Sequence, residues 1–577
     1  MTHAVENAEI ARLLREMADV LELQDANPFR VRAYRNAART VEELASPVAV
    51  MLDQDGAKLR ELPGIGEDLA GKIAEISRTG ELGALRKAAR GVPAGARELM
   101  RLSSIGPKRA RALAESIGVR TLPGLARAAR AGRLRTIRGF GPRTEERILR
   151  ELAARPGGEV RLLRARATQY ADALAGHMRA APGVGRVEVV GSFRRCRETV
   201  GDLDVLAESD GGRAVIAHFV AYPEVAEVLA QGSTKASVRL RSGLHVDLRV
   251  IPAESFGAAL VYFTGSKAHN IVLRRMGRDR GLKINEYGVF RGARRVAGRD
   301  EEEIYRAVGL PWIAPELRED RGEVEAAHQG TLPALLDLDD IRGDLHAHTT
   351  STDGSDTLEA MADAAETLGY DYLAVTDHTA RLKIVHGMDR DGFRRQMRRI
   401  DRLNSRLRRL TLLKGAEVDI LADGSLDLDD DTLRALDIVL VSIHSKFDLP
   451  PAEQTRRVVR ALSHPSVDVF AHPTGRIIER RRGAEFDFGE VCRVAAGRGV
   501  LLEVNAQPER LDLDDVCARA AVEHGVHLVV STDAHATAEL RFMSWGVGQA
   551  RRGWAEKKHV ANTLPLGALL KLLHRRR

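Results

Sequence analysis

The chain has 577 residues, of which 44% are hydrophobic and 29% are charged. This balance excludes a disordered or fibrous protein, and no apolar run reaches the ~18 residues needed to cross a bilayer. A net charge of +8 and a pI of about 9.4 favour a polyanionic partner. The first residues lack the apolar segment of a signal peptide, so we expect a cytoplasmic, nucleoid-associated protein. The three cysteines are too few and too scattered for a disulfide framework or a thiolate zinc site.

Three similar Gly-containing breaks, at 62–73, 102–113 and 137–149, interrupt the helical periodicity of the first 150 residues. A helical pattern with basic residues follows each break. Glycines in such turns permit positive φ and let backbone N–H groups approach a phosphate, and the next helix adds its positive dipole end. We interpret the breaks as helix–hairpin–helix motifs that hold a DNA backbone without reading bases. The glycines expected to contact DNA are Gly64, Gly66, Gly106, Gly139 and Gly141.

Strand-like runs begin near residue 186, and three of their acids form a candidate metal site. Asp202 and Asp204 lie two apart in an extended run, so both carboxylates face one side. Asp247 stands in the apolar and basic run LHVDLRVI, where an unpaired buried carboxylate would be costly. Three carboxylates can hold two Mg²⁺ or Mn²⁺ ions about 3.5–4 Å apart, the arrangement used for in-line phosphoryl displacement.

A glycine–serine turn precedes these acids, in the run GSFRRCRETVGDLDV that starts at Gly191. This run resembles the nucleotidyltransferase motif of family X DNA polymerases, and YFTGSKAHNIVLR (262–274) and INEYGVF (284–290) resemble later motifs of that family. The resemblance extends from near residue 1 to about 320. It implies that Asp202, Asp204 and Asp247 bind the two catalytic ions and that Asp247 helps to activate the primer 3′-hydroxyl. It also implies nucleotide binding by Ser192, Arg195, Gly201, Tyr262, Phe263, Gly265, Asn270 and Arg274.

A lysine near the first Gly-containing break is a second candidate catalytic residue. The segments 27–38 and 62–73 resemble the deoxyribose-phosphate lyase domain of the same family, and Lys72 falls at the position of its Schiff-base lysine. Lysine can form an imine, which arginine cannot. The alternative is that Lys72 grips a phosphate or is simply solvated.

Histidines and acids follow the short apolar strands predicted in the last third of the chain. Strands alternate with amphipathic helices there, which predicts a parallel α/β barrel whose strand ends converge on one face. Nine nitrogen and oxygen ligands on that face can hold two or three Mn²⁺ or Zn²⁺ ions and support phosphodiester hydrolysis. The nine are His346, His348, Asp353, His378, Glu417, His444, His472, Asp533 and His535.

This histidine-rich region, about 340–546, resembles the PHP (polymerase and histidinol phosphatase) domain, with all nine ligand positions filled. A family X polymerase joined to a PHP domain implies a DNA polymerase that also has metal-dependent 3′–5′ exonuclease activity, with abasic-site endonuclease activity as a further option. We expect a monomer that uses gapped or primer–template DNA and dNTPs to fill short gaps in DNA repair, with no membrane partner.

The predicted fold class is multidomain α and α/β: a helix–hairpin–helix N-terminal region, a family X nucleotidyltransferase palm and thumb, and a distorted (β/α) PHP barrel. The expected units are a lyase-like DNA-binding domain (1–90), a fingers-type helical region (91–155), a palm (156–255), a thumb-like nucleotide-binding subdomain (256–318), a linker (319–339) and a PHP nuclease domain (340–577). Three alternatives stay open: a PHP nuclease or phosphoesterase for which the polymerase half mainly positions DNA, a small-molecule phosphoesterase, and a non-catalytic DNA-binding scaffold.

Overall fold

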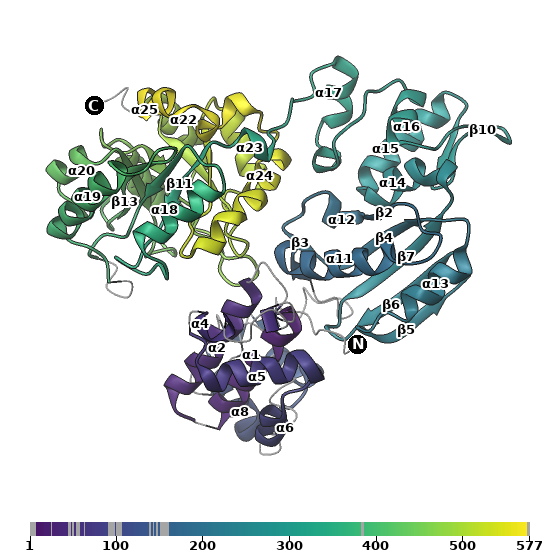
Figure 1. Ribbon diagram of the computed structural model, residues 1–577, viewed down its shortest axis with the longest axis horizontal. Coiled ribbons are helices and arrows are strands. Elements are labelled where there is room, and N and C mark those ends of the chain that lie inside the picture. The colour runs from purple at the N-terminus through teal and green to yellow at the C-terminus, as the bar shows by residue number, and fades with distance from the viewer. Residues whose placement is uncertain are drawn as a thin grey trace.

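The computed structural model contains a helical N-terminal part, a palm sheet with a smaller neighbour, and a C-terminal barrel (Figure 1). None of the helices it describes has the length and apolar character needed to span a membrane. The residues described are 7–24, 26–43, 48, 51–52, 58–62, 64–89, 99, 105, 107–137, 140–141, 144–145, 148–149, 161–381 and 386–573.

The N-terminal part is a set of helices around one apolar core, whose buried residues run from Ile10 to Ile148. Its α-helices are α1 (Asn7–Leu23), α2 (Pro28–Glu43), α4 (Lys58–Glu61), α5 (Glu67–Thr79), α6 (Gly83–Ala89), α8 (Pro107–Ile117) and α9 (Leu122–Arg130). Glycines frame α5, because Gly66 is its N-cap and Gly80 ends it with a φ of 70° in the left-handed region. The units predicted as 1–90 and 91–155 thus contribute to a common core.

The palm is a five-stranded sheet in the order β2 (Val187–Val189), β4 (Asp202–Glu208), β7 (His245–Ile251), β6 (Lys235–Leu240) and β5 (Val225–Gln231). The central pair, β4 and β7, is parallel, and the other neighbours are antiparallel. Helices α11 (Arg164–Arg179) and α13 (Gly212–Val220) bury apolar residues against the sheet. The short pair β1 (Leu162–Leu163) and β3 (Thr199–Val200) and the turn of helix α12 (Gly191–Arg194) precede β4.

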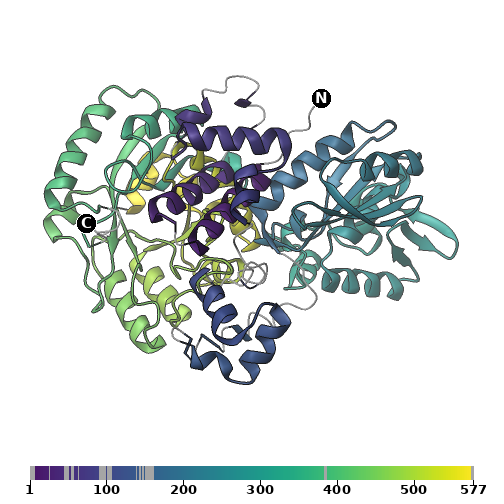
Figure 2. The same ribbon diagram turned by 90° about the horizontal axis from the view of Figure 1, so that it is seen from below.

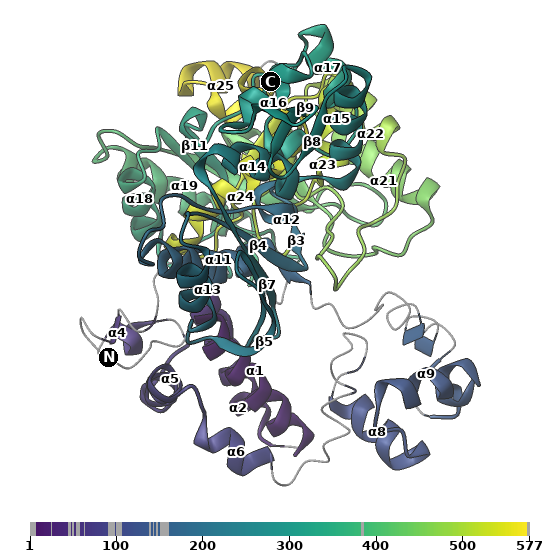
Figure 3. The same cartoon turned by 90° about the vertical axis from the view of Figure 1, so that its right-hand side faces the viewer.

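A smaller subdomain follows the palm, and Figure 3 shows it at the end of the palm opposite the N-terminal helices. Its elements are α14 (Phe256–Thr264), α15 (Lys267–Asp279), β8 (Lys283–Asn285), β9 (Gly288–Arg291), β10 (Arg294–Ala297) and α16 (Glu301–Ala307). The segment 319–339, which we predicted to be a linker, contains α17 (Glu323–Gln329). Val324 and Ala327 of that helix are buried in the core of this subdomain, so part of the segment is folded against it.

The C-terminal part is a seven-stranded parallel barrel, as the strand pattern predicted. Its strands follow chain order: β11 (Gly343–Ala347), β12 (Tyr372–Val375), β13 (Thr411–Asp419), β14 (Ile438–Ser442), β15 (Val469–Phe470), β16 (Leu501–Asn505) and β17 (Leu528–Ser531). A parallel bridge between Ala347 and Ala534 brings the chain after β17 back to β11, which nearly closes the barrel. All residues of β11, β12, β14 and β17 are buried, as expected for strands that are covered on both faces.

Helices surround the barrel: α18 (Leu358–Thr367), α19 (Arg390–Asn404), α20 (Asp430–Ala435), α21 (Pro451–Leu462), α22 (Phe488–Arg498), α23 (Asp515–Glu523), α24 (Met543–Arg552) and α25 (Leu566–Leu573). Side-chain oxygens of Thr357, Asp389, Asp429, Asp487 and Asp514 accept bonds from the first turns of α18, α19, α20, α22 and α23. Leu569 and Leu573 of α25 join inward residues of the strands in one apolar cluster, so one end of the barrel is filled. Polar side chains are left for the carboxyl ends of the strands.

Ion pairs join the barrel to the parts that precede it. In Figure 2 the palm and its neighbouring subdomain extend to one side of the barrel, while the N-terminal helices overlap the barrel in the view. Arg552 at the end of α24 lies 3.0 Å from Glu319, and Arg476 lies 2.6 Å from Glu198. The Arg552 side chain is only 2% exposed, so this contact is an internal part of the molecule.

Candidate active sites

Three aspartates lie together on one face of the palm sheet. Asp204 on β4 stands directly opposite Asp247 on the parallel strand β7, and Asp202 precedes Asp204 by two residues on the same face. The register of the sheet therefore brings together the three acids that sequence reasoning selected. Several groups of acids and histidines among the described residues have possible metal-ligand atoms within 4.8 Å of one another. These three aspartates do not form one of those groups.

The electrostatics of these aspartates fit divalent cations. Burial and the carboxylates of Asp202 and Asp247 raise the pKa of Asp204 to about 7. A group that is costly to ionise alone gains most from a bound cation, and hard ions such as Mg²⁺ prefer carboxylate oxygens. Gly191 packs over the same site with a φ of 67°, and a Cβ there would lie 2.6 Å from Asp204 Oδ2. Only glycine fits this close approach.

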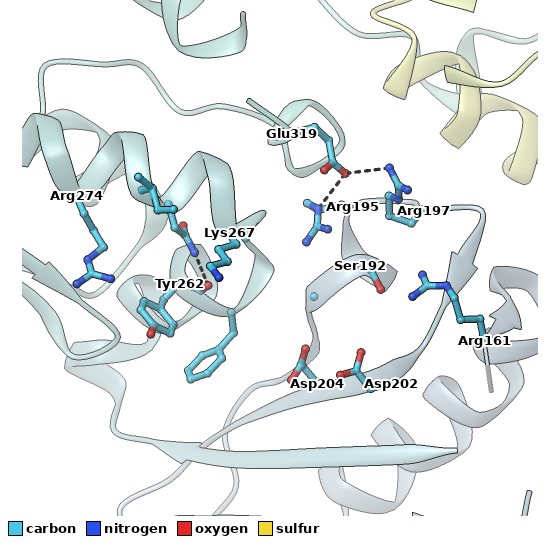
Figure 4. A pocket seen from close by; sticks show the side chains of 15 residues that line it. Arg161, Ser192, Arg195, Arg197, Asp202, Asp204, Tyr262, Lys267, Arg274 and Glu319 are labelled. Atoms are coloured by element: carbon cyan, nitrogen blue, oxygen red, sulfur yellow. Dashed lines mark hydrogen bonds and ion pairs between the residues drawn. The ribbon is translucent and has the colours of Figure 1, made fainter. Parts of the chain in front are cut away.

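A cavity of about 720 Å³ opens beside Asp202 and Asp204 (Figure 4). Seven of the eight residues predicted to bind the nucleotide line it: Ser192, Arg195, Tyr262, Phe263, Gly265, Asn270 and Arg274. Gly201 and Asp247 are not among the lining residues. Arg161, Arg197 and Lys267, which were not predicted to bind the nucleotide, add positive charge to the wall; Arg197 and Lys267 lie inside the two quoted motifs, whereas Arg161 has no motif signal of its own. The result is a basic cavity with two carboxylates at one side, suited to a triphosphate with its cations.

Two carboxylates of the following subdomain position the arginines of the GS turn. Glu319 Oε1 accepts a hydrogen bond from Arg195 at 3.1 Å and another from Arg552 of the barrel at 3.0 Å. Arg194 forms a two-pronged pair with Glu301, at 2.8 and 2.9 Å. The turn that begins with Gly191 is therefore fixed from outside the palm, by contacts more than 100 residues away in the sequence.

The second candidate site lies at the carboxyl ends of the barrel strands, where all nine predicted ligands come together. Each belongs to at least one group whose ligand atoms lie within 4.8 Å of one another. The groups are His348, Asp353, His378 and His535; His346, Glu417 and His472; His346, His348 and Asp533; and His378, Glu417 and His444. Because the groups share members, they form one continuous centre with room for more than one ion.

Glu417 lies at the middle of this centre. Its Oε1 is 2.8 Å from His472 Nε2 and 3.2 Å from His444 Nε2, and its Oε2 is 2.9 Å from His378 Nδ1. Although burial alone would favour the neutral acid, the surrounding imidazoles hold the pKa of Glu417 well below its usual range. His346 Nε2 and His348 Nε2 complete the ring, each at 3.5 Å from Oε2. A buried carboxylate with five imidazoles around it has the composition of a multinuclear metal site.

Several buried polar atoms of this centre form no well-directed hydrogen bond among the residues that the structure describes, even where two of them lie close together, as His378 Nδ1 and Glu417 Oε2 do at 2.9 Å. They are His346 Nε2, both ring nitrogens of His348, His378 Nδ1, Glu417 Oε2 and His472 Nδ1. An orphaned buried donor or acceptor costs about 1–3 kcal/mol, so this concentration needs an explanation. Divalent cations supply one, because each nitrogen or carboxylate oxygen becomes a ligand. The residues present therefore fit Mn²⁺ or Zn²⁺.

An outer set of polar residues orients the ligands, and sequence reasoning missed it. His346 Nδ1 lies 2.7 Å from Glu503 Oε1, and the other oxygen of Glu503 accepts from the backbone N–H of His472 at 2.6 Å. Asn505 donates to both Glu503 and Asp533, at 3.1 Å each. Such partners fix the ring orientation of a ligating histidine and raise its basicity. The signal that could have revealed Glu503 is an acid inside the otherwise apolar strand LLEVN.

Two ligands of the barrel centre occupy unusual backbone conformations. His472 has a φ of 27° and Asp533 a φ of 52°, in the left-handed region that residues other than glycine rarely adopt. Strained conformations of this kind persist where the surrounding structure imposes them, and they concentrate at functional sites. Burial and the neighbouring imidazoles lower the pKa of His348 to about 3, which leaves that ring neutral and ready to accept a cation.

The first helix–hairpin–helix turn lies within the described residues except for position 63, and the other two lie there only in part. Gly64 has a φ of 74° and both Gly64 and Gly66 are exposed ahead of α5, as expected for a turn that meets a phosphate. Gly141 is exposed, whereas Gly106 and Gly139 lie outside the described residues.

Lys72 sits on α5, beyond this turn, and pairs with Asp68. Burial disfavours its charge, but hydrogen bonds with Asp68 and Tyr34 raise its pKa above the ordinary value.

The chain is similar to known proteins along its whole length. Four family models match: a helix-hairpin-helix domain (5–82), a SAM-like helix-hairpin-helix tandem (96–154), the DNA polymerase beta thumb (259–319) and the PHP domain (344–506). The DNA polymerase/3′-5′ exonuclease PolX of Bacillus subtilis is 38% identical over 562 residues, 97% of each chain. A probable phosphatase of Acetivibrio thermocellus is 30% identical over 206 residues, which are 34% of this chain and 80% of the relative.

Proposed function

The chain belongs to the PolX family of DNA polymerase/3′-5′ exonucleases, and we propose how its two sites divide these activities. The palm site would carry nucleotide addition and the barrel centre would carry hydrolysis. This division is supported by one observation. Three acids lie on the palm sheet, and a separate group of acids and imidazoles lies on the barrel sheet. We further propose that the enzyme fills short gaps during DNA repair, which would place its work at the nucleoid in the cytoplasm.

In the palm, Asp202, Asp204 and Asp247 would hold two Mg²⁺ or Mn²⁺ ions. When bound, these cations neutralise phosphate charge and favour attack by the primer 3′-oxygen on the α-phosphorus. The new P–O bond forms as the bond to pyrophosphate breaks. Asp247 would take up the proton of the 3′-hydroxyl. Ser192 and Arg195 would bind the triphosphate.

The rest of the basic cavity would orient the nucleotide. Tyr262, Phe263 and Gly265 would lie beside its sugar, Asn270 and Arg274 beside the nascent base pair and the template, and Gly201 beside the phosphates. Most of these residues line the same cavity as the two aspartates, which supports the proposal.

In the barrel, the nine clustered ligands would hold two or three Mn²⁺ or Zn²⁺ ions, which supply a Lewis acid and an activated water when bound. Hydrolysis of the terminal phosphodiester would release a nucleoside monophosphate and leave a new 3′-hydroxyl. Glu503 and Asn505 would keep His346 and Asp533 in place. The orphaned buried atoms of this centre support the proposal. Abasic-site cleavage would use the same chemistry on another DNA substrate.

The N-terminal helices would bind the backbone of gapped or primer–template DNA through Gly64, Gly66 and Gly141, together with Gly106 and Gly139. Lys72 would add lyase chemistry at the same place. The similarity to a helix-hairpin-helix domain over 5–82 and to a tandem over 96–154 supports DNA contacts in this part. A single chain carries both candidate sites, so we propose that the enzyme works as a monomer.

Separate substitutions test the division of labour. Asp202→Ala should abolish extension of a gapped primer with Mg²⁺ and dNTPs while 3′–5′ degradation continues. Asp533→Ala should do the reverse, because it removes a ligand of the barrel centre. A matched control is Asp210→Ala, an exposed acid just after β4 that should change neither activity. Extension at the wild-type rate by Asp202→Ala would refute the palm assignment.

A second candidate for the barrel is hydrolysis of small phosphate esters, because a third of the chain is similar to a probable phosphatase. The two candidates differ in substrate. A phosphomonoester and single-stranded DNA, compared at equal concentration in the presence of Mn²⁺, should show preference for DNA if the barrel is an exonuclease. Faster turnover of the monoester would favour the phosphatase alternative.

A further inference from the structure

A second cavity, of about 820 Å³, lies on the barrel outside the metal centre. Helix α19 forms one side of it, and the segment 386–389 with Ser351 forms another. Neither proposed active site includes this cavity. Its lining has a net positive charge, because four arginines line it and Asp389 is the only acid among its described lining residues. The Asp389 carboxylate is already engaged, since it accepts from the backbone of Gly392 as the N-cap of α19.

The four arginines form a stripe along one flank of α19: Arg395, Arg398, Arg399 and Arg402. Their spacing of three and four residues places them on one helical face, and Arg395 to Arg402 spans roughly 10 Å. All four are exposed. Arg399 pairs with Glu359 of α18, with N···O contacts of 2.5 and 3.0 Å. For the other three, the structure shows no ion pair within its described residues.

Some arginines of the barrel helices form local ion pairs. Arg434 pairs with Asp431 at 2.6 Å, and Arg519 pairs with Glu523 at 2.8 Å. Such local pairs offset part of the positive charge of a helix face. Within the described residues, Arg395, Arg398 and Arg402 have no such carboxylate partner and line one cavity, so they leave a positive field there, which favours phosphate groups.

The cavity shares a wall with the metal centre. Gln396, on its floor, donates to Asp377, the residue before the ligand His378. The N–H of Met388, another lining residue, donates to the carbonyl of His378 at 2.8 Å. Ser351 lies in the loop between His348 and Asp353, two further ligands. A chain of phosphates in this cavity would therefore continue directly into the centre.

We propose that this cavity binds the phosphodiester backbone of a single DNA strand, next to the 3′ end that the barrel centre hydrolyses. This inference rests on the proposed nuclease function of the barrel. The three arginines without a carboxylate partner within the described residues offer up to three contacts to the phosphates of one strand. The cavity has the size of a small-ligand site, ~300–1,000 Å³, which suits a strand better than a duplex. Among its described lining residues the arginines outnumber the single aromatic ring, that of His386, so the cavity is better suited to the backbone than to the bases.

The test compares two triple variants of the full chain. Arg395→Ala/Arg398→Ala/Arg402→Ala removes the stripe, and Arg456→Ala/Arg493→Ala/Arg498→Ala removes equal charge from exposed positions on α21 and α22 of the same barrel. The substrates are a labelled single-stranded oligonucleotide and bis(p-nitrophenyl) phosphate, a diester with no neighbouring phosphates.

The stripe variant should lose far more kcat/KM on the oligonucleotide than on the small diester, so that the ratio of the two falls at least tenfold. The slope of log KM against log salt should fall by about 2, because each single-strand phosphate contact contributes roughly 0.7. The control triple variant should keep both the ratio and the slope of the wild type. Equal behaviour of the two triple variants would overturn the proposal, and an equal loss on both substrates would do the same.

A second measurement separates this inference from the nuclease assignment. A photoreactive p-benzoylphenylalanine in place of Arg398 should crosslink to the labelled strand, whereas the same residue in place of Arg456 should not. Crosslinking does not require cleavage. If the wild type cleaves neither substrate, the nuclease assignment fails, and crosslinking alone then decides whether the cavity binds DNA. Absence of crosslinks from both positions would overturn the strand-binding proposal.

Discussion

Glu301, at the start of α16, connects the turn that begins at Gly191 with the following subdomain. Its Oε1 accepts from Arg194 at 2.8 Å and from Arg318 at 2.7 Å, and its Oε2 accepts from Trp312 at 3.0 Å. Arg318 is completely buried. Burial alone would raise the pKa of Glu301, but the two guanidinium groups outweigh it and lower that pKa from 4.5 to about 2. Glu301→Gln keeps the shape and removes the charge.

The expected cost follows from this pKa in two ways. A fall from 4.5 to about 2 corresponds to about 3 kcal/mol of stability, at ~1.4 kcal/mol per pKa unit. Because the folded-state pKa is the lower one, this stabilisation is fully present above pH 4.5 and is lost as the pH falls toward 2. Removal of one partner from a buried pair costs about 3–5 kcal/mol, because Arg318 is left buried and uncompensated. Both routes predict about 3 kcal/mol.

Urea unfolding followed by tryptophan fluorescence can measure this cost. The chain has three tryptophans, so a background with Trp545→Phe and Trp554→Phe leaves Trp312, which contacts Glu301, as the reporter. Glu301→Gln should lower the free energy of unfolding at pH 7 by about 3 kcal/mol, and the difference from wild type should shrink below pH 4.5. Glu302→Gln, an exposed neighbour on the same helix, should change stability by less than about 0.5 kcal/mol. A loss below about 1 kcal/mol for Glu301→Gln would contradict the reasoning.

Two further predictions concern the other parts of the chain. If Lys72 forms an imine, borohydride should trap wild-type protein on abasic DNA and should fail to trap Lys72→Arg; no trapped product from the wild type would rule out lyase chemistry at this residue. Mn²⁺ at about a hundred times its Kd should raise the free energy of unfolding of the barrel by about 2.7 kcal/mol, measured by urea unfolding with and without a chelator. The gain should vanish in Asp533→Ala, and an unchanged gain would remove Asp533 from the metal centre.

The features that sequence reasoning found are those fixed by short-range geometry. Asp202 and Asp204 share a face because strand side chains alternate, and the histidines of the barrel follow strands whose ends must converge. The placement of Asp204 opposite Asp247 needed one long-range assumption, that β4 and β7 pair in register. The barrel could therefore be predicted from local patterns and the rules of parallel sheets. The palm, whose strands are mostly antiparallel, was predicted from the resemblance of its motifs to those of family X DNA polymerases.

The features that sequence reasoning missed depend on contacts between distant segments. Glu503 and His346 are in contact although they lie 157 residues apart in the sequence, and neither position belongs to a motif that indicates the other. The helix α17 lies in a stretch with proline and glycine signals of a linker, but Val324 and Ala327 find apolar partners in the preceding subdomain. Tertiary burial overrides local signals in such segments.

Glu319 shows why the two halves of the chain should be treated as one enzyme. Its carboxylate is shared between Arg195, which lines the palm cavity, and Arg552, which belongs to the barrel. Burial opposes the charge of Glu319, but both arginines favour it and lower its pKa. Arg552 also donates to the backbone carbonyl of Arg195 at 2.6 Å. Arg195 lines the palm cavity while its Nε donates to Glu319. Phosphate oxygens that approached this guanidinium would therefore meet a group that also takes part in the domain contact. Truncation of the barrel would therefore disturb the cavity it leaves behind, and each activity has to be measured in the full chain.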